Sequence, residues 1–221
     1  MEAIAEIDGA TDVKAVVVTG EGQTFCAGDD LKVMQQSLAG DGVAAAKLGA
    51  AFNSMLLALS RIPVPTIAVV DGYACGGGLE IMLSCDMAVA ADEALIGDAH
   101  MRQNLAGHLS MWDLPHHINR QKAFELAVTG RFLTGKEAES YGLVLQSAPR
   151  NERDGYVESL LAQLRDKSLS ALKLSKRLFQ QASAIPSLEE ALAFVDAEKR
   201  RDKEAWRDME SGMKSFVDKT R

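Results

Sequence analysis

Residues 71–80 read Asp71-Gly72-Tyr73-Ala74-Cys75-Gly76-Gly77-Gly78-Leu79-Glu80. We expect an apolar strand over residues 65–70 and an apolar helix over residues 77–84, so the glycines lie where a strand leads into a helix. Glycine lets the backbone approach a ligand closely, and the first N–H groups of a helix have no partner within it. Such groups stabilise negative charge, including that of a developing oxyanion. Glu80 falls in the first turn of this helix, which favours proton transfer at a carbon next to a carbonyl.

A second strand with a glycine-rich loop precedes the first. Residues 13–19 are predicted to form a buried parallel strand, and they run into the loop of residues 20–31. Either loop alone is weak evidence for a site, because glycine-rich turns after strands are common. As a pair, they predict an oxyanion hole with one backbone N–H from each loop.

Five segments together resemble the crotonase superfamily, the enoyl-CoA hydratase/isomerase family: residues 25–31, 62–80, 85–91, 126–131 and 138–144. The likeness covers nearly the whole chain and departs most strongly over residues 104–120. It implies an α/β fold, with a crotonase-like repeated ββα spiral core over residues 1–145. A helical C-terminal region that forms trimers would follow over residues 146–221.

The resemblance also implies roles for individual residues. The backbone N–H groups of Asp29 and Gly77 would hold the thioester oxygen of an acyl-CoA. Glu80 matches one of the two catalytic glutamates of the hydratases. No cofactor is expected, because the coenzyme A thioester is itself the substrate.

Several positions are expected to contact coenzyme A. Ala27 and Leu31 match the loop that receives the adenine, and Phe216 and Lys219 match an aromatic residue and a lysine that reach the coenzyme A of a neighbouring subunit. Lys32 is a candidate for the positive charge that an anionic ligand needs. The resemblance therefore predicts a homotrimer or a dimer of trimers.

The second glutamate of the hydratases is replaced here by His100. Two carboxylates divide acid and base work around a water molecule. One carboxylate with one imidazole still moves protons, since histidine titrates near neutrality, but the hydrogen-bond pattern differs. His100 is therefore predicted either to share the catalysis or to fill a wall of the pocket.

All four histidines lie within residues 100–117. No metal site is predicted, because the adjacent His116 and His117 do not have the i, i+4 spacing of a helical metal motif. His108, Ser110, Trp112 and Asp113 are expected to shape the acyl pocket. A Ser-His-Asp triad is not proposed from this segment, because nothing predicts a sharp nucleophile elbow at Ser110.

The start of the chain also departs from the family, whose members open with a β-hairpin and a helix. Residues 3–7 resemble the end of that helix, so the first two strands are expected to be missing. Their absence would leave an open sheet edge and remove some contacts to coenzyme A. Beyond residue 121 the pattern turns helical, ending in one long helix over residues 187–211 with Ser187 as its N-cap.

The composition excludes several classes of protein. Of the 221 residues 47% are hydrophobic, enough for a globular core, and the net charge of −7 argues against nucleic-acid binding. No apolar run is expected to reach the length of a membrane span, and no signal peptide is expected at the start of the chain. The thiols Cys26, Cys75 and Cys85 have no metal spacing and favour a reducing, cytoplasmic location, although a lost targeting segment would change that prediction.

These features favour an acyl-CoA enzyme that stabilises a thioester enolate, and hydration of a 2-enoyl-CoA is the first choice because Glu80 is retained. An enoyl-CoA isomerase is the second choice, since one carboxylate moves a proton between two carbons. An acyl-CoA hydrolase is the third, prompted by the histidines. A non-catalytic member that binds acyl-CoA remains the alternative from a different class.

Overall fold

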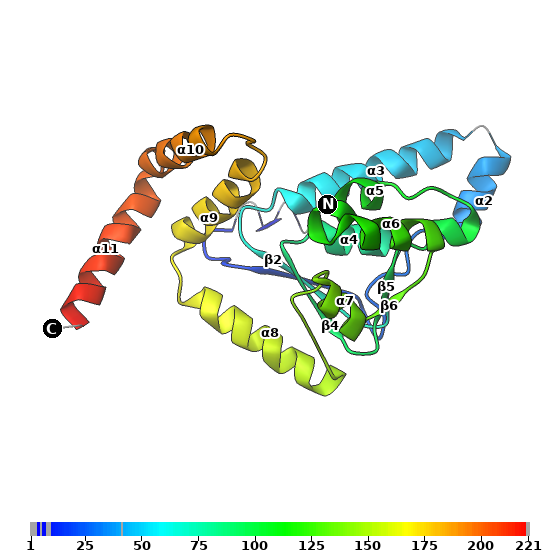
Figure 1. Cartoon of the computed structure of the whole chain (residues 1–221), viewed down its shortest axis with the longest axis horizontal. Coiled ribbons are helices and arrows are strands. Elements are labelled where there is room, and N and C mark those ends of the chain that lie inside the picture. Colours follow the sequence, from blue (N-terminus) through cyan, green and yellow to red (C-terminus); the bar gives the residue numbers. More distant parts are fainter. Residues whose placement is uncertain (1–3, 5, 8–9, 41, 220–221) are drawn as a thin grey trace.

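This computed structural model describes residues 4, 6–7, 10–40 and 42–219 (Figure 1). The expected helix end at residues 3–7 lies partly outside the described residues. The fold is α/β, as predicted, with two sheets and helices on both sides of them.

The larger sheet is parallel and has the strand order β1-β2-β4-β7. Its strands are β1 (Val16–Thr19), β2 (Thr66–Val70), β4 (Met87–Ala91) and β7 (Gln146–Ala148). All five residues of β2 are buried, because helices cover both faces of this strand. Among the described strands β1 forms one edge of the sheet. The predicted boundary between residues 145 and 146 falls directly before β7, which pairs with β4.

The smaller sheet has the order β3-β5-β6 and contains β3 (Tyr73–Cys75), β5 (Leu95–Gly97) and β6 (Leu133–Thr134). The chain repeats a ββα unit, in which one strand joins the larger sheet, the next joins the smaller sheet, and a helix follows. β2 leads into β3 and then α4 (Gly77–Leu83), and β4 leads into β5, η1 (His100–Gln103) and α5 (Leu109–His117). β1 leads into an isolated bridge at Cys26, which extends the smaller sheet at Ala74. This is the repeated ββα arrangement that was predicted.

Two apolar layers enclose the larger sheet. Ala68 and Val70 of β2 face the main core, which also contains Leu79 of α4 and residues of α6 (Arg120–Thr129) and α7 (Gly135–Tyr141). Ile67 and Val69 face the opposite side, where they pack against α8 (Arg150–Arg165). This alternation follows the two-residue period of a strand.

Ion pairs tie α8 to the loop that leads into the glycine-rich segment. Asp71 follows β2 directly and pairs with Arg150 at 3.0 Å and with Arg153. Arg153 is buried, so its guanidinium requires this partner. The helix on one face of the sheet therefore fixes the start of the loop that carries the site.

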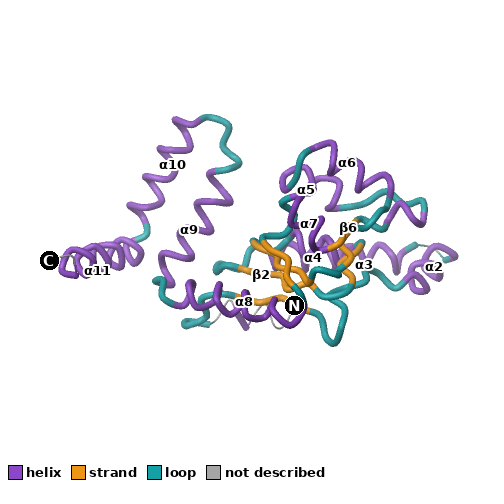
Figure 2. The backbone as a smooth tube through the Cα atoms, turned by 60° about the horizontal axis from the view of Figure 1, so that its bottom comes forward, coloured by secondary structure: helices purple, strands orange, loops and turns teal. Residues whose placement is uncertain are grey.

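The last three helices extend away from the sheets (Figures 1 and 2): α9 (Leu169–Ala182), α10 (Leu188–Arg201) and α11 (Lys203–Lys219). The prediction of one helix over residues 187–211 is wrong, because the chain breaks at Asp202. The backbone of Asp202 is not helical, and its carboxylate accepts a hydrogen bond from the Ala205 N–H at 3.1 Å. Ser187 caps α10 as predicted, accepting the Glu190 N–H.

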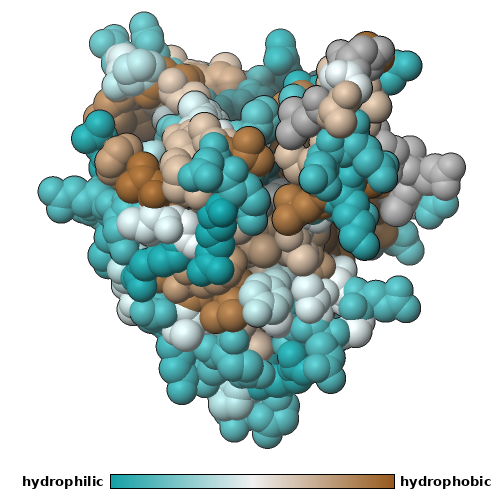
Figure 3. All heavy atoms as spheres, turned by 90° about the vertical axis from the view of Figure 1, so that its right-hand side faces the viewer, coloured by the Kyte–Doolittle hydropathy of each residue, from teal (hydrophilic) through white to brown (hydrophobic). Residues whose placement is uncertain are grey.

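A pair of helices, α2 (Leu31–Ala39) and α3 (Val43–Ser60), lies at the opposite end from α11. By length and composition α3 is apolar enough to cross a membrane, with a mean hydropathy of 1.4, and the sequence reading missed this. In the folded chain its Leu56 and Leu59 are buried in the domain, while Val43, Leu48 and Leu57 are exposed. Figure 3 views this end of the molecule, where apolar side chains are exposed among polar ones.

Candidate active site

The two glycine-rich loops meet at the centre of the molecule. Cys26, in the first loop, pairs in parallel with Ala74 of β3. Gly28 has a φ of +89°, and a Cβ at this position would lie 2.9 Å from the Cys75 carbonyl oxygen and 3.4 Å from the Gly77 nitrogen. Only glycine fits both the backbone angle and the close approach. The loops are therefore in backbone contact next to the first residue of α4.

This contact brings the two predicted oxyanion donors to one place. Asp29 follows Gly28, and Gly77 opens α4 after Gly76, whose φ of 55° and ψ of −122° favour glycine. Among the residues that the structure describes, neither the Asp29 N–H nor the Gly77 N–H has a hydrogen-bond acceptor in the chain. Both N–H groups are thus available to an oxygen atom of a ligand.

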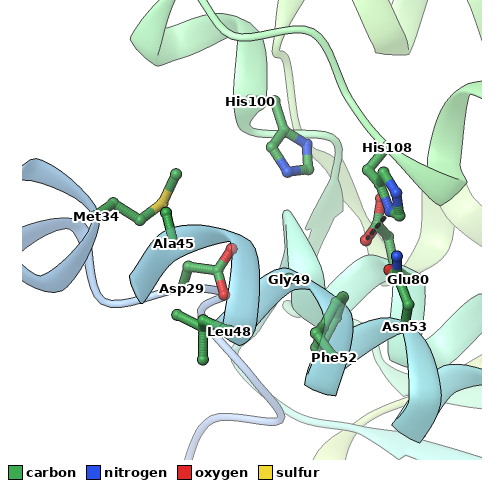
Figure 4. Close-up of a pocket in the computed structure, with 10 residues that line it drawn as sticks. All are labelled: Asp29, Met34, Ala45, Leu48, Gly49, Phe52, Asn53, Glu80, His100 and His108. Carbon is green, nitrogen blue, oxygen red and sulfur yellow. Dashed lines mark ion pairs between the residues drawn. The ribbon is translucent and has the colours of Figure 1, made fainter. Parts of the chain in front are cut away.

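Glu80 lies in the first turn of α4, and its side chain is almost completely buried, with the residue 1% exposed. Its Oε1 accepts a hydrogen bond from the backbone N–H of Ser110 at 3.1 Å. Its Oε2 lies 3.9 Å from Nδ1 of His108, the ion pair drawn in Figure 4. The carboxylate is therefore held in one orientation by the start of α5.

His100 is the other titratable group at the centre of the site. Its Nδ1 lies 2.5 Å from Oδ1 of Asp98, and a Cβ on Gly76 would lie 3.9 Å from its Cε1 and Nε2. The hydrogen bond to Asp98 raises the pKa of His100 above its ordinary value, and the negative charges of Asp98, Glu80 and Asp29 act in the same direction against partial burial. The imidazole is therefore stabilised in its protonated form.

Asp98 is completely buried, and its carboxylate accepts hydrogen bonds from two side chains. Burial alone would raise its pKa, but the hydrogen bonds from His100 and Ser110 outweigh burial, so the pKa lies below the ordinary value. Ser110 Oγ donates to Asp98 Oδ2 at 2.6 Å. A buried carboxylate is thus kept ionised beside the imidazole.

Glu80 and His100 face one cavity of about 190 Å³, which we call the catalytic cavity (Figure 4). In Figure 4 the His100 ring points into it from η1, while Asp29 lies on the opposite side from Glu80 and His108. One wall is formed by α3. The lining residues are Asp29, Met34, Ala45, Leu48, Gly49, Phe52, Asn53, Glu80, His100 and His108.

A second cavity, of about 420 Å³, shares Asp29, Met34 and His100 with the catalytic cavity. We call it the loop-side cavity, because residues of both glycine-rich loops line it, including Ala27, Gly28, Leu31, Gly76 and Gly77. Arg102 also lines it; this side chain lies over the Phe132 ring and donates to the Gly130 carbonyl at 2.7 Å.

A third cavity, of about 680 Å³, shares Asn53 and His108 with the catalytic cavity. We call it the helix-side cavity, because its walls are α3, α5 and α9. Its lining is mostly apolar and includes Leu56, Leu57, Leu109, Trp112 and Phe179. The three cavities therefore form a series, with Glu80 and His100 at the middle one.

The structure brings most of the predicted site residues together. Glu80, His100 and Asp29 line the catalytic cavity, while Ala27, Leu31 and Gly77 line the loop-side cavity. His108, Trp112 and Asp113, which were expected to shape the acyl pocket, line the helix-side cavity. Ser110 does not shape that pocket: the residue is 1% exposed, and its hydroxyl is turned to Asp98.

Three predicted coenzyme A contacts are not part of these cavities in the single chain. Lys32 lies exposed on α2, where its backbone N–H donates to Asp30. Phe216 and Lys219 belong to α11, at the far end of the molecule from α2 and α3 (Figure 1). The Lys219 side chain lies outside the described part of the chain.

Sequence reasoning missed Asp98 and the helix α5 that carries Ser110. The signal for Asp98 is its place two residues before His100, directly after β5. α5 was hidden by Pro115, which lies inside the helix, and by the two histidines after it. No group of three or more metal-ligating side chains is found among the described residues.

Comparison with known proteins gives matches along the whole chain. A family model described as enoyl-CoA hydratase/isomerase matches residues 1–221. A probable enoyl-CoA hydratase of Mycobacterium tuberculosis is 32% identical over 220 residues, which cover 98% of this chain and 82% of that protein. A probable mitochondrial enoyl-CoA hydratase of Dictyostelium discoideum is 31% identical over 230 residues, covering 98% of this chain and 78% of that protein.

Comparison with solved structures also finds enoyl-CoA hydratases. The crystal structure of an enoyl-CoA hydratase from Polaromonas sp. JS666 matches with a TM-score of 0.90 at 27% identity. The match covers 99% of this chain and 84% of that one.

Proposed function

Since this chain belongs to the enoyl-CoA hydratase/isomerase family, we propose that it adds water across the double bond of a 2-enoyl-CoA thioester. The observation that carries this proposal is the placement of Glu80 and His100 on one cavity, beside the Asp29 and Gly77 N–H groups. A hydratase needs a base for water, an acid for carbon and donors for the enolate oxygen. Each of these groups has a candidate here.

The proposed reaction runs through a thioester enolate. Glu80 takes a proton from water as the water oxygen bonds to C3 of the substrate. The electrons of the double bond move toward the thioester, and the Asp29 and Gly77 N–H groups donate to its oxygen. His100 then gives its Nε2 proton to C2. Glu80 ends protonated and His100 neutral, and proton exchange with solvent restores both groups.

The order of the three cavities suggests how an acyl-CoA substrate would be oriented in the site. The loop-side cavity, with Ala27, Leu31 and Arg102, would take the arm of coenzyme A, and the charge of Arg102 suits an anionic ligand. The helix-side cavity would take the acyl tail past Asn53 and His108. Its volume and apolar lining favour long or aromatic acyl groups over short ones.

We expect the enzyme to act as a trimer or a dimer of trimers. Large apolar side chains are exposed on the three last helices, and such clusters mark interaction surfaces. They include Phe179, Leu188, Leu192, Trp206, Met209 and Met213. In such an assembly, Lys32 of one subunit and Phe216 and Lys219 of another would contact the same coenzyme A.

We also expect the protein to work in the cytoplasm, where the thiols Cys26, Cys75 and Cys85 stay reduced. The relative from Dictyostelium is described as mitochondrial, so the compartment is a separate question from the activity.

An enoyl-CoA isomerase is the second candidate, favoured by the same placement of Glu80 and His100. A carboxylate that removes a proton from one carbon and an imidazolium that protonates another would shift the double bond without water.

Mass spectrometry of products from a panel of 2-enoyl- and 3-enoyl-CoA thioesters tests the proposal. A gain of one water that Glu80→Gln abolishes supports the hydratase. A matched surface control, Glu158→Gln on α8, should behave like the parent. A shifted double bond at unchanged mass would identify an isomerase instead of a hydratase. Hydrolysis of the thioester would identify an acyl-CoA hydrolase instead of either. Binding of acyl-CoA with no product from any thioester would favour a non-catalytic member.

A further inference from the structure

We propose that Asp98 is a positioning residue for acid catalysis, which keeps the His100 ring oriented and charged so that Nε2 delivers the proton. This inference rests on the proposed function and deepens it, because the acid and base of the proposed reaction are His100 and Glu80, and the reaction itself assigns no role to Asp98. The geometry that carries it is the chain of hydrogen bonds from His100 through Asp98 and Ser110 to Glu80.

The two bonds from His100 to Asp98 fix the ring. Oδ1 of Asp98 lies 2.5 Å from Nδ1 of His100 and 3.1 Å from its backbone nitrogen. With Nδ1 occupied as a donor, Nε2 is the ring atom left to exchange a proton. The Nε2 edge of the ring faces Gly76 and the catalytic cavity.

Ser110 links this pair to the base. Its hydroxyl donates to Asp98 Oδ2, and its backbone N–H donates to Glu80 Oε1. One residue in the first turn of α5 therefore fixes both carboxylates. The acid and the base are set at a constant relative position, as coordinated proton transfer at two neighbouring carbons of one substrate requires.

The loop before α5 is packed tightly around this network. A Cβ on Gly107 would lie 2.3 Å from Asp98 Oδ2 and 2.5 Å from Ser110 Oγ. Asp98 has no exposed surface, so its charge is balanced by these partners and not by solvent. A buried carboxylate with such partners acts on the imidazole with little screening.

The other charged and titratable groups around His100 come from several elements. Glu80 on α4 and Asp29 in the first loop add negative charge, whereas Arg102 on η1 and His108 before α5 line the adjoining cavities. Among the described residues none of these groups is hydrogen bonded to the His100 ring, whereas Asp98 is. Removal of its charge is therefore the most specific perturbation.

The test is Asp98→Asn, which keeps the side-chain shape and removes the charge. The first measurement is an NMR titration of histidine ring nitrogens without substrate, with the His100 signal assigned by His100→Gln. We expect the pKa of His100 to fall in Asp98→Asn while the other three histidines titrate as in the parent. The matched control Asp166→Asn, at the exposed C-terminus of α8, should leave all four unchanged.

The second measurement is kcat against pH. In Asp98→Asn the alkaline fall of kcat should move to lower pH, with a loss of about tenfold or more at pH 8 that shrinks as the pH is lowered. KM should change little, because Asp98 does not line the catalytic cavity. A loss that is equal at every pH, with an unchanged His100 titration, would overturn the proposal and leave Asp98 a structural role.

The parent protein provides a measurement that does not depend on the variant folding. His100 should keep its proton on Nδ1 when neutral and should titrate above a histidine in a peptide. The opposite tautomer would overturn the proposal. If the protein hydrates no enoyl-CoA but His100 titrates as described, the proposed function fails while the coupling of Asp98 to His100 stands.

Discussion

Glu80 accepts a hydrogen bond from the backbone N–H of Ser110 at 3.1 Å, so the first turn of α4 and the first turn of α5 meet at one carboxylate. The two helices belong to successive ββα turns of the chain, and Glu80 and Ser110 are 30 positions apart in the sequence. Ser110 also holds Asp98, and Asp98 holds His100. The orientation of both titratable groups therefore depends on how the second turn is docked on the first.

The approach of the two loops makes a prediction about Gly28. A Cβ in Gly28→Ala would lie 2.9 Å from the Cys75 carbonyl, which would push apart the Asp29 and Gly77 N–H groups. We expect kcat to fall about a hundredfold or more, the typical effect of losing an oxyanion donor. Steady-state kinetics with the best substrate of the panel measures this loss.

Gly22→Ala is the matched control. Gly22 also has a positive φ, of +77°, but a Cβ there would meet nothing within 4 Å. The control should lose a similar amount of stability from backbone strain and keep its kcat within about twofold. Equal losses of kcat in both variants would point to strain instead of the oxyanion geometry.

The raised pKa of His100 predicts how stability depends on pH. The folded protein binds the His100 proton more tightly than the unfolded chain does, where the pKa of histidine is about 6.5. The stabilisation is therefore complete below that value and is lost as the pH rises through the folded pKa. Urea unfolding of the parent and of His100→Gln at about pH 5.5 and pH 8.5 measures it.

The parent should exceed His100→Gln in free energy of unfolding by more at the acidic pH than at the alkaline pH. A difference that grows with pH would mean that the folded site disfavours the proton, opposite to the geometry seen here.

A buried lysine should be important for the docking of α9. Lys176 donates to the Val64 carbonyl at 3.1 Å and pairs with Asp86 at 2.6 Å. Lys176→Met leaves both acceptors without this donor, so we expect a loss of about 1–3 kcal/mol in the free energy of unfolding. Chemical denaturation measures it, and the exposed Lys167→Met should change stability by less than about 0.5 kcal/mol.

The helix-side cavity predicts a dependence on acyl length. Trp112 lines this cavity but not the catalytic cavity, and its ring contacts that of His116 in a tilted arrangement, with centroids 4.6 Å apart and an interplanar angle of 47°. Trp112→Ala should raise KM for long-chain or aromatic enoyl-CoA about tenfold and leave short-chain substrates nearly unchanged. The ratio of kcat/KM for the two classes is the measurement. An equal change in kcat/KM for long-chain and short-chain substrates would mean that the acyl tail does not bind in the helix-side cavity.

Much of the fold was predictable from local patterns. The apolar run before Gly72 and the three glycines from Gly76 predicted β2 and the start of α4 to within a residue or two, whereas the short strand β3 between them was expected to be loop. Ser187 was recognisable as an N-cap, and its hydroxyl accepts the Glu190 N–H at the start of α10. The break at Asp202 was not predicted, because the helical periodicity continues on both sides and only the cap geometry ends α10.

The sequence alone identified the candidate groups for the chemistry: two glycine-rich loops for backbone donors, Glu80 as a carboxylate next to one of them, and His100 at the position of the second glutamate of the hydratases. The loops and Glu80 follow from residue type and from position relative to predicted strands and helices, which are local properties of the chain, whereas His100 follows from the resemblance to the family. Only the tertiary structure decided how they work together. Ser110 reaches both Glu80 and Asp98 because α5 packs on α4, and contacts between residues distant in sequence leave no local pattern to read.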